Sequence, residues 1–250
     1  MSDAQLFMVR AEFDQPALIR FAAHSSLPLR LLDDGYVLHA ATRALFGDAA
    51  PRPFVVRPAN GRRLTVLGYA GRDHRALVEL ARATADPLAV SAVDLDSLCS
   101  KAMPSSWRAG AVYGFEARVC PVVRISGRAA GGRPRETDAF IHQCLRVGAG
   151  IAVDRQEVYR EWLAGELGRG AAARMRRAKL VRFQRKRLSR RDRSNGRAGL
   201  RRCERPDATL EGVLEVASAA AFDALLRRGL GRHRAFGFGM LLLRAGVTDA

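Results

Sequence analysis

Apolar residues recur along the chain in short runs and at helical spacing, which predicts a structure that mixes strands and helices. Four runs have the apolar and β-branched content of strands: residues 5–12, 54–57, 64–69 and 90–93. Two segments place apolar side chains on one face of a helix: residues 15–24 and 72–85. The Asn60-Gly61 pair between two of the strand-like runs is a strong hairpin signal.

Residues 35–46 form a further predicted helix, for which Asp34 is a good N-cap. Its apolar positions are expected to face the core: Val37, Leu38, Ala41 and Leu45. Tyr36, His39 and Arg43 share another face, at positions i, i+3 and i+7. An imidazole can exchange a proton near neutral pH, and a guanidinium can hold a phosphate. The face is therefore a candidate for chemistry, although an ordinary surface or core histidine fits the same pattern.

The second half of the chain repeats the mixture of strands and helices after a polar linker at residues 101–107 (KAMPSSW). A strand is expected from residue 113 to about Pro121, followed by a Gly- and Arg-rich loop and by helices at 138–145 and 155–167. Trp162 lies at a core position of the last helix. The chain closes with a strand (209–216), a helix (219–228), a glycine-rich loop (229–240) and a strand (240–244), which is half of a ferredoxin-like unit.

The glycine-rich loop reads GLGRHRAFGFGM and holds four glycines. Backbone N–H groups of such a loop can line a concavity for anionic oxygens, and Arg232 and Arg234 would add positive charge there. A tight loop whose basic residues face solvent is the alternative. The chain has no GKS or GKT sequence after the loop, so a P-loop nucleotide site is not expected.

Composition favours a polyanionic partner. The chain has 42 Lys and Arg against 25 Asp and Glu, a net charge of +17, and nucleic acid is the first candidate for a protein this basic. Residues 174–205 hold 15 Lys or Arg and only two acids, and they turn at Ser194-Asn195-Gly196. We interpret this segment as strands or a hairpin that contact nucleic acid, with a disordered basic loop as the alternative.

Several other classes of protein are not expected. No apolar run approaches the ~20 residues that span a bilayer, and the N-terminus lacks the layout of a signal peptide, so a cytoplasmic location is expected. The four cysteines are widely spaced and form no zinc or redox motif. No carboxylate cluster suits magnesium, and neither a metal nor a cofactor is expected.

Four motifs, in order along the chain, resemble those of the CasE family, the CRISPR repeat-processing endoribonucleases of type I-E systems. YVLH at 36–39, with the Leu45-Phe46 pair, resembles the family's YxLH helix, and FEARVCPVVR at 115–124 resembles its FRLRANPxK strand. LEGVLEV at 210–216 resembles its FEGxLxV strand. GLGRHRAFGFGMLLL at 229–243 resembles its GxGxxKAxGxGLLxL ending, with Arg234 in place of the usual lysine.

The resemblance implies an α+β fold of the RAMP superfamily with two tandem ferredoxin-like, RRM-like domains, each an antiparallel sheet with helices on one face. We place the domains at 1–107 and 108–250. The implied activity is metal-independent cleavage of CRISPR precursor RNA beside the stem-loop of each repeat. The ribose 2′-OH attacks the adjacent phosphate and leaves a 2′,3′-cyclic phosphate and a 5′-OH. The mature crRNA is then retained in the type I-E surveillance complex, Cascade, beside its backbone subunit.

The resemblance places His39 at the family's catalytic histidine, as general acid or base, and Tyr36 at its accessory tyrosine. Arg43 is the candidate cation, from helical spacing alone. His24 is a rival histidine, because the segment before Tyr36 is longer than the family pattern. The expected RNA contacts lie on the second domain: Arg118, Arg124, Lys179, Arg182, Arg185, Lys186, Arg187, Arg190, Arg191, Gly229, Gly231, Arg232, His233, Arg234, Gly237 and Gly239.

Two other functions remain open from the sequence: a non-catalytic crRNA-binding subunit on the same fold, and a DNA-binding regulator.

Overall fold

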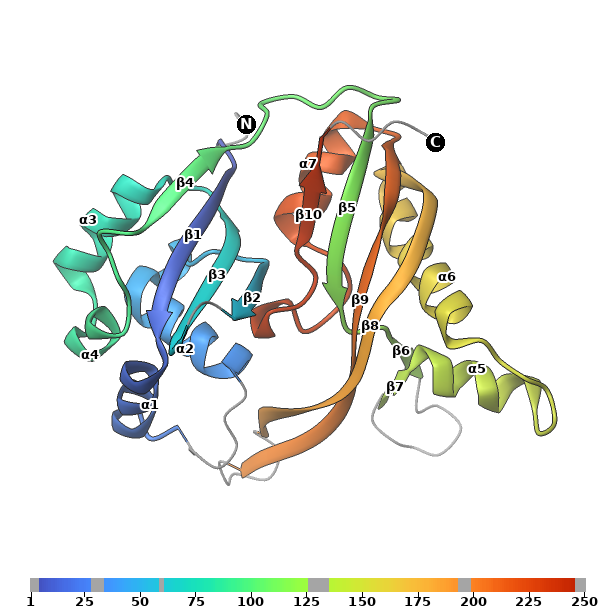
Figure 1. Cartoon of the computed structure of the whole chain (residues 1–250), viewed down its shortest axis with the longest axis horizontal. Helices are drawn as coiled ribbons and strands as arrows, with labels where there is room; N and C mark the ends of the chain where they lie inside the picture. Colours follow the sequence, from blue (N-terminus) through green and yellow to red (C-terminus); the bar gives the residue numbers. More distant parts are fainter. Residues whose placement is uncertain (1–4, 28–33, 59–60, 126–134, 193–198, 246–250) are drawn as a thin grey trace.

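Two four-stranded antiparallel sheets lie side by side in the computed structural model of the chain (Figure 1). The structure describes residues 5–27, 34–58, 61–125, 135–192 and 199–245. Within them, no helix is long and apolar enough to cross a membrane.

The first sheet has the strand order β2-β3-β1-β4, which is that of a ferredoxin-like unit. Its strands are β1 (Phe7–Asp14), β2 (Phe54–Pro58), β3 (Arg63–Ala70) and β4 (Cys99–Ala102). Its helices are α1 (Gln15–His24), α2 (Asp34–Phe46), α3 (His74–Thr84) and α4 (Pro87–Ser91). The core between them contains the apolar positions predicted for α2, together with Val9, Phe13 and Val66.

Local signals explain where these helices begin. The carboxylates of Asp14 and Asp73 accept hydrogen bonds from the N–H groups of Ala17 and Ala76, at 2.8 and 2.9 Å, and so cap α1 and α3. The strand predicted at 90–93 is wrong, because residues 90 and 91 belong to α4 and Ala92 follows as its C-cap. Asp86 caps this helix and Pro87 opens it, and this start signal outweighs the β-branched content that follows.

The second sheet has the order β10-β5-β9-β8 and repeats the ferredoxin-like topology. Its elements are β5 (Val112–Val119), α6 (Arg155–Gly168), β8 (Ala173–Asp192), β9 (Gly199–Val216), α7 (Ala219–Arg228) and β10 (Leu241–Arg244). Leu163 of α6 and Phe222 of α7 are fully buried in one core with Phe115 of β5. The expected fold class is therefore confirmed. The predicted boundary at residue 107 falls between β4 and β5.

An additional unit follows β5: β6 (Val122–Ile125), β7 (Arg135–Asp138) and α5 (Ala139–Val147). The sequence predicts a single loop from residue 124 to the next helix. Both ends of that segment are strands instead, because Arg124 and Ile125 of β6 pair with Glu136 and Arg135 of β7. The composition did not reveal that the two arms of this segment pair with each other. Residues 126–134 lie outside the described part.

The basic segment forms a long hairpin of β8 and β9, which extends well beyond the rest of its sheet (Figure 1). The two strands pair from Ala173↔Val216 to Asp192↔Gly199, with irregularities between Met175 and Arg177 and between Leu180 and Arg182. The described part of the segment is therefore a hairpin and not a disordered loop. The predicted turn at 194–196 lies outside the described residues.

The two sheets share buried contacts. The hydroxyl of Tyr69 on β3 donates a hydrogen bond of 2.8 Å to the carbonyl oxygen of Leu241 on β10, and both residues are buried. Leu6 and Val55 of the first half lie in the core of the second. The Arg57 guanidinium of β2 also pairs with the Glu116 carboxylate of β5.

The glycine-rich loop folds back on itself at this junction. The N–H of Leu230 donates to the carbonyl oxygen of Gly239, at 2.8 Å, and the N–H of Gly239 donates to that of Arg118, at 2.7 Å. Gly239 has φ +81°, and a Cβ on it would lie 2.3 Å from the carbonyl oxygen of Leu230. A Cβ on Gly229, with φ +75°, would lie 2.9 Å from the Pro53 ring. Both positions therefore require glycine.

Gly239→Ala should lower the free energy of unfolding by about 3 kcal/mol, because the methyl group meets main chain that cannot move aside. Urea denaturation measures the change. Gly71→Ala is the matched control, because a Cβ there has no neighbour within 4 Å. Equal stability of the two variants would contradict this description of the loop.

Candidate functional site

The helix face predicted to carry chemistry meets the glycine-rich loop of the other half. The loop contains a short 3-10 helix, η5 (Arg234–Phe236). Its Phe236 ring stacks on the ring of Tyr36, with centroids 5.9 Å apart and an interplanar angle of 9°. The ring of His39 meets Phe236 edge-on, at 6.1 Å. Tyr36 and His39 therefore lie where α2 of the first sheet touches the loop of the second.

His39 and Arg43 line a cavity of about 570 Å³ on the first half. The Arg43 guanidinium donates to the Asp48 carboxylate at 2.6 Å and to the carbonyl oxygen of Gly47 at 3.0 Å. Arg43 thus lies beside His39 as helical spacing predicted, and its Nη1 already has two protein acceptors. Arg52 and Arg72 line the same cavity.

The surroundings of His39 favour its neutral form. Partial burial lowers the pKa of the imidazole below its ordinary value of 6.5, and the positive charges of Arg52 and then Arg43 lower it further. A neutral imidazole at neutral pH can accept a proton.

Sequence reasoning missed Arg52. It lies in the short connector Pro51-Arg52-Pro53 before β2, which carries no motif and no helical spacing. Only its charge and its flanking prolines distinguish it in the sequence. Its position becomes visible when α2, β3 and the glycine-rich loop are assembled.

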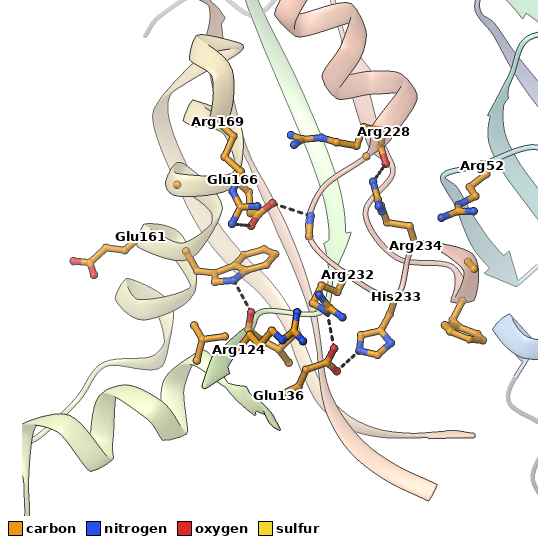
Figure 2. A pocket seen from close by; sticks show the side chains of 18 residues that line it. Arg52, Arg124, Glu136, Glu161, Glu166, Arg169, Arg228, Arg232, His233 and Arg234 are labelled. Carbon is orange, nitrogen blue, oxygen red and sulfur yellow. Dashed lines mark hydrogen bonds and ion pairs between the residues drawn. The ribbon is translucent and has the colours of Figure 1, made fainter. Parts of the chain in front are cut away.

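A second cavity, of about 910 Å³, lies against the glycine-rich loop (Figure 2). Its charged lining consists mainly of arginines: Arg52, Arg124, Arg169, Arg228, Arg232 and Arg234. Burial lowers the pKa of Arg234, as do the charges of Arg52 and Arg228, so cations gather here. Trp162 packs against the core as predicted and also lines this cavity, and its Nε1 donates to the carbonyl oxygen of Val122 at 3.2 Å.

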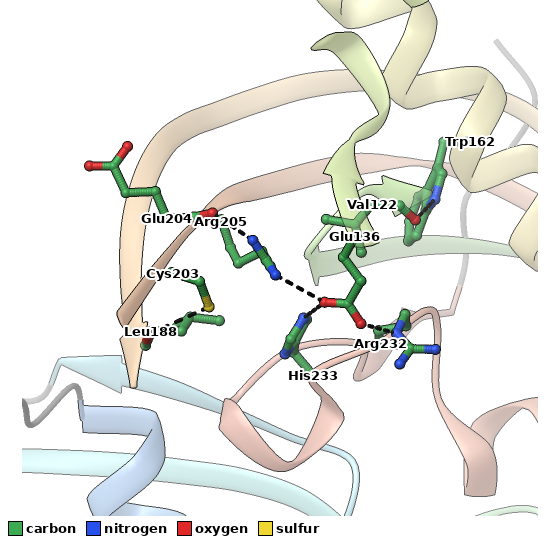
Figure 3. A network of polar contacts seen from close by, with 9 residues as sticks. All are labelled: Val122, Glu136, Trp162, Leu188, Cys203, Glu204, Arg205, Arg232 and His233. Atoms are coloured by element: carbon green, nitrogen blue, oxygen red, sulfur yellow. Dashed lines mark hydrogen bonds and ion pairs between the residues drawn. The ribbon is translucent and has the colours of Figure 1, made fainter. Parts of the chain in front are cut away.

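Glu136 of β7 holds two predicted RNA contacts in place (Figure 3). Its carboxylate accepts from Arg232 Nε at 2.5 Å, lies 3.0 Å from His233 Nε2 and accepts from Arg205 Nη2 at 3.3 Å. The hydrogen bond with His233 is the main cause that lowers the Glu136 pKa, to about 2, and the nearby positive charges add to it. The His233 side chain is only 8% exposed, whereas that of Arg232 is 48% exposed. Arg232 is therefore the more accessible of the two.

Arg118, a predicted RNA contact, is paired with an acidic residue inside the second half of the chain. Its guanidinium donates to both oxygens of the buried Asp207 carboxylate, at 2.8 and 2.7 Å, and lies 4.7 Å from the centre of the Phe238 ring. The side chain is 13% exposed. Arg118 thus connects β5, β9 and the glycine-rich loop inside the protein and does not present its charge to solvent.

The remaining predicted contacts are distributed over two surfaces. Arg124 is exposed and lines the larger cavity. Lys179, Arg182, Arg185 and Arg187 are exposed along β8, and Lys186 is half-buried. Arg185 and Arg187 each lie 3.6 Å from the Glu204 carboxylate. The side chains of Arg190 and Arg191 lie outside the described part. The rival His24 is exposed at the end of α1 and lines neither cavity.

No group of three or more His, Cys, Asp or Glu side chains within the described ranges is arranged to hold a metal ion.

Solved structures with the same fold cover nearly the whole chain. The CRISPR endoribonuclease Cse3 bound to a 19-nucleotide RNA matches with a TM-score of 0.60 and 17% identity, over 95% of this chain and 99% of that one. Cas6e of Escherichia coli K-12 matches at 0.57 and 18%, over 95% and 98%. A chain of a CRISPR RNA-guided surveillance complex matches at 0.55 and 13%, over 95% and 98%. At these identities the matches show the fold.

Among curated proteins, no sequence matches the chain. A family model described as CRISPR associated protein matches residues 6–245. Because this match covers nearly all of the sequence, the chain belongs to the CRISPR associated protein family.

Proposed function

We propose that the protein is a metal-independent endoribonuclease that cleaves CRISPR precursor RNA beside the stem-loop of each repeat. One observation carries this proposal: the Tyr36 and His39 face of α2 lies against the glycine-rich loop, with Arg43 and Arg52 beside it. A proton acceptor, a phenol and fixed positive charge are thereby brought together at the junction of the two sheets.

This arrangement suits attack by a ribose 2′-OH on the adjacent phosphate. Neutral His39 takes the proton of the hydroxyl as the oxygen bonds to phosphorus. The bond from phosphorus to the 5′ oxygen then breaks, and that oxygen takes up a proton, for which Tyr36 is the candidate donor. The products are a 2′,3′-cyclic phosphate and a 5′-OH. Negative charge on the phosphorane is stabilised by the nearby guanidinium groups.

The basic surfaces fit an RNA hairpin as the substrate. Exposed cations follow the β8–β9 hairpin, and arginines line the larger cavity beside the candidate catalytic residues. Structures with the same fold include one bound to RNA and one within a surveillance complex. They support the proposal that this protein keeps its crRNA in the type I-E complex, Cascade, beside the backbone subunit, in the cytoplasm.

His39→Ala should slow single-turnover cleavage of a repeat hairpin by about 1,000-fold, because it removes the general base. Affinity for the hairpin should change little, since the basic surfaces remain intact. A gel assay of cleavage and a filter-binding assay measure the two effects. His24→Ala is the matched control and should cleave at the wild-type rate. Full cleavage by His39→Ala would remove this residue from the mechanism.

Excess EDTA should leave the cleavage rate unchanged, because the proposed chemistry uses only side chains of the protein. Mass spectrometry of the 5′ fragment should show a 2′,3′-cyclic phosphate. A substrate with a 2′-deoxyribose before the scissile phosphate serves as the control and should remain intact. Loss of activity in EDTA that returns with added Mg²⁺ would contradict metal independence.

The cleavage rate should rise with pH and level off near neutrality, with a midpoint below 6.5, the ordinary pKa of histidine. The sign follows from the role of a base: His39 must be neutral, and burial, Arg52 and Arg43 all lower the pKa at which it loses its proton. Single-turnover rates across this pH range provide the test. A rate that falls as pH rises through this range would instead assign His39 as the acid.

A further inference from the structure

The main chain of Arg52 is held at the junction of the two sheets. Its N–H donates to the carbonyl oxygen of Tyr69 at 2.7 Å, and the N–H of Tyr69 donates to the carbonyl oxygen of Pro53 at 3.0 Å. A Cβ on Gly68 of β3 would lie 2.7 Å from Pro51 Cβ, so β3 packs directly on the connector. Gly229 of the glycine-rich loop packs on Pro53 from the other side. The backbone of Arg52 is therefore fixed from both halves of the chain.

The guanidinium of Arg52, in contrast, has no hydrogen-bond or ion-pair partner within the part of the chain that the structure describes, and the residue is exposed. Two of the neighbouring arginines are engaged: Arg43 pairs with Asp48, and Arg234 donates to the carbonyl oxygen of Arg228. A cation on a rigid backbone that lacks a protein acceptor is ready to receive an anion from outside.

Arg52 lines both cavities, the one with His39 and the one with the glycine-rich loop. Its positive charge acts on His39 on one side and on Arg234 on the other. In Figure 2 the Arg52 side chain extends toward Arg234, whose guanidinium points to the carbonyl oxygen of Arg228. Arg52 is thus within reach of an RNA strand that would occupy both cavities.

We propose that Arg52 binds the scissile phosphate and is a catalytic residue, in a role for which the sequence suggested Arg43. This inference rests on the proposed function. The Arg52 guanidinium donates hydrogen bonds to the non-bridging oxygens of this phosphate, which gain negative charge as the 2′ oxygen attacks. Arg43, held by Asp48 and Gly47, contributes charge near His39 without contacting the phosphate.

The first test measures single-turnover cleavage by Arg52→Gln, Arg52→Lys and the control Arg75→Gln. Arg52→Gln should be slower by about 100-fold, the effect of removing one donor to a developing oxyanion. Arg52→Lys should recover part of that loss, because it keeps the charge but not the planar fork of donors. Arg75 is exposed on α3 and lines neither cavity, so Arg75→Gln should match the wild type.

The second test measures binding, without cleavage, to repeat hairpins blocked by 2′-deoxyribose. A neutral methylphosphonate replaces one phosphate at a time along the unpaired flank of the stem. Wild type should lose about 10-fold in affinity when the scissile phosphate is neutral, because a charge-assisted hydrogen bond is lost. For Arg52→Gln, neutralising the scissile phosphate should not change the affinity, whereas neutral phosphates elsewhere should weaken binding as they do in wild type. Arg43→Gln should still lose affinity when the scissile phosphate is neutral.

The outcomes separate the two proposals. Suppose that wild type cleaves, and that Arg52→Gln either keeps the full rate or still loses affinity when the scissile phosphate is neutral. Arg52 then does not bind the scissile phosphate, and the endoribonuclease proposal stands. If Arg52→Gln loses sensitivity at a different phosphate, Arg52 binds RNA but not at the reacting group, and the inference is overturned. If wild type does not cleave at all, both proposals fail.

Discussion

The close approach of the glycine-rich loop to the first sheet is the constraint on which the rest of the site depends. Gly229 lies against Pro53, and Gly239 lies against the backbone of Leu230, at distances that no side chain allows. This closure brings Phe236 onto Tyr36 and His39. Neither half of the chain contains the candidate site alone: α2 supplies Tyr36 and His39, the groups proposed to transfer protons, and the loop supplies the surface that faces them.

The charge of the protein is divided between cations with structural partners and cations without them. Asp207 neutralises Arg118 inside the fold, and Glu136 ties Arg232 and His233 of the loop to Arg205 of the hairpin. These acidic residues hold basic elements together at positions where like charges would otherwise repel. The excess positive charge then remains for an external anion, as the net charge of +17 suggested from the start.

Much of the fold could be predicted from residue patterns, because the signals are local. The bounds predicted for α1 and α7 match the structure, and apolar spacing identified the buried face of α2. The motifs led to the family and the paired ferredoxin-like topology. The prediction of a strand at 90–93 failed because Asp86 and Pro87 start a helix. The β6–β7 pairing was missed because the register between distant residues leaves no local pattern in the sequence.

The candidate site could be predicted only in part, for the same reason. Tyr36 and His39 share one helix, so their spacing made them candidates, and the resemblance to the CasE family supplied their expected roles. Arg52 became a candidate only because its connector contacts residues 69 and 229, which are distant in sequence: Arg52 bonds to Tyr69, and Pro53 packs on Gly229. Likewise, nothing local indicates that Asp207 buries Arg118 or that Glu136 engages His233. A count of basic residues predicts a polyanionic partner but does not separate arginines that are paired inside the fold from those that face solvent.

The most direct test of this account is a crystal structure of the protein with a repeat hairpin blocked by 2′-deoxyribose before the scissile phosphate. The account predicts that this phosphate lies at the junction of the two sheets. Its non-bridging oxygens should be within hydrogen-bond distance of the Arg52 guanidinium, and the 2′ carbon of the preceding ribose should face the imidazole of His39. A scissile phosphate bound along the β8–β9 hairpin, away from α2 and the glycine-rich loop, would contradict it.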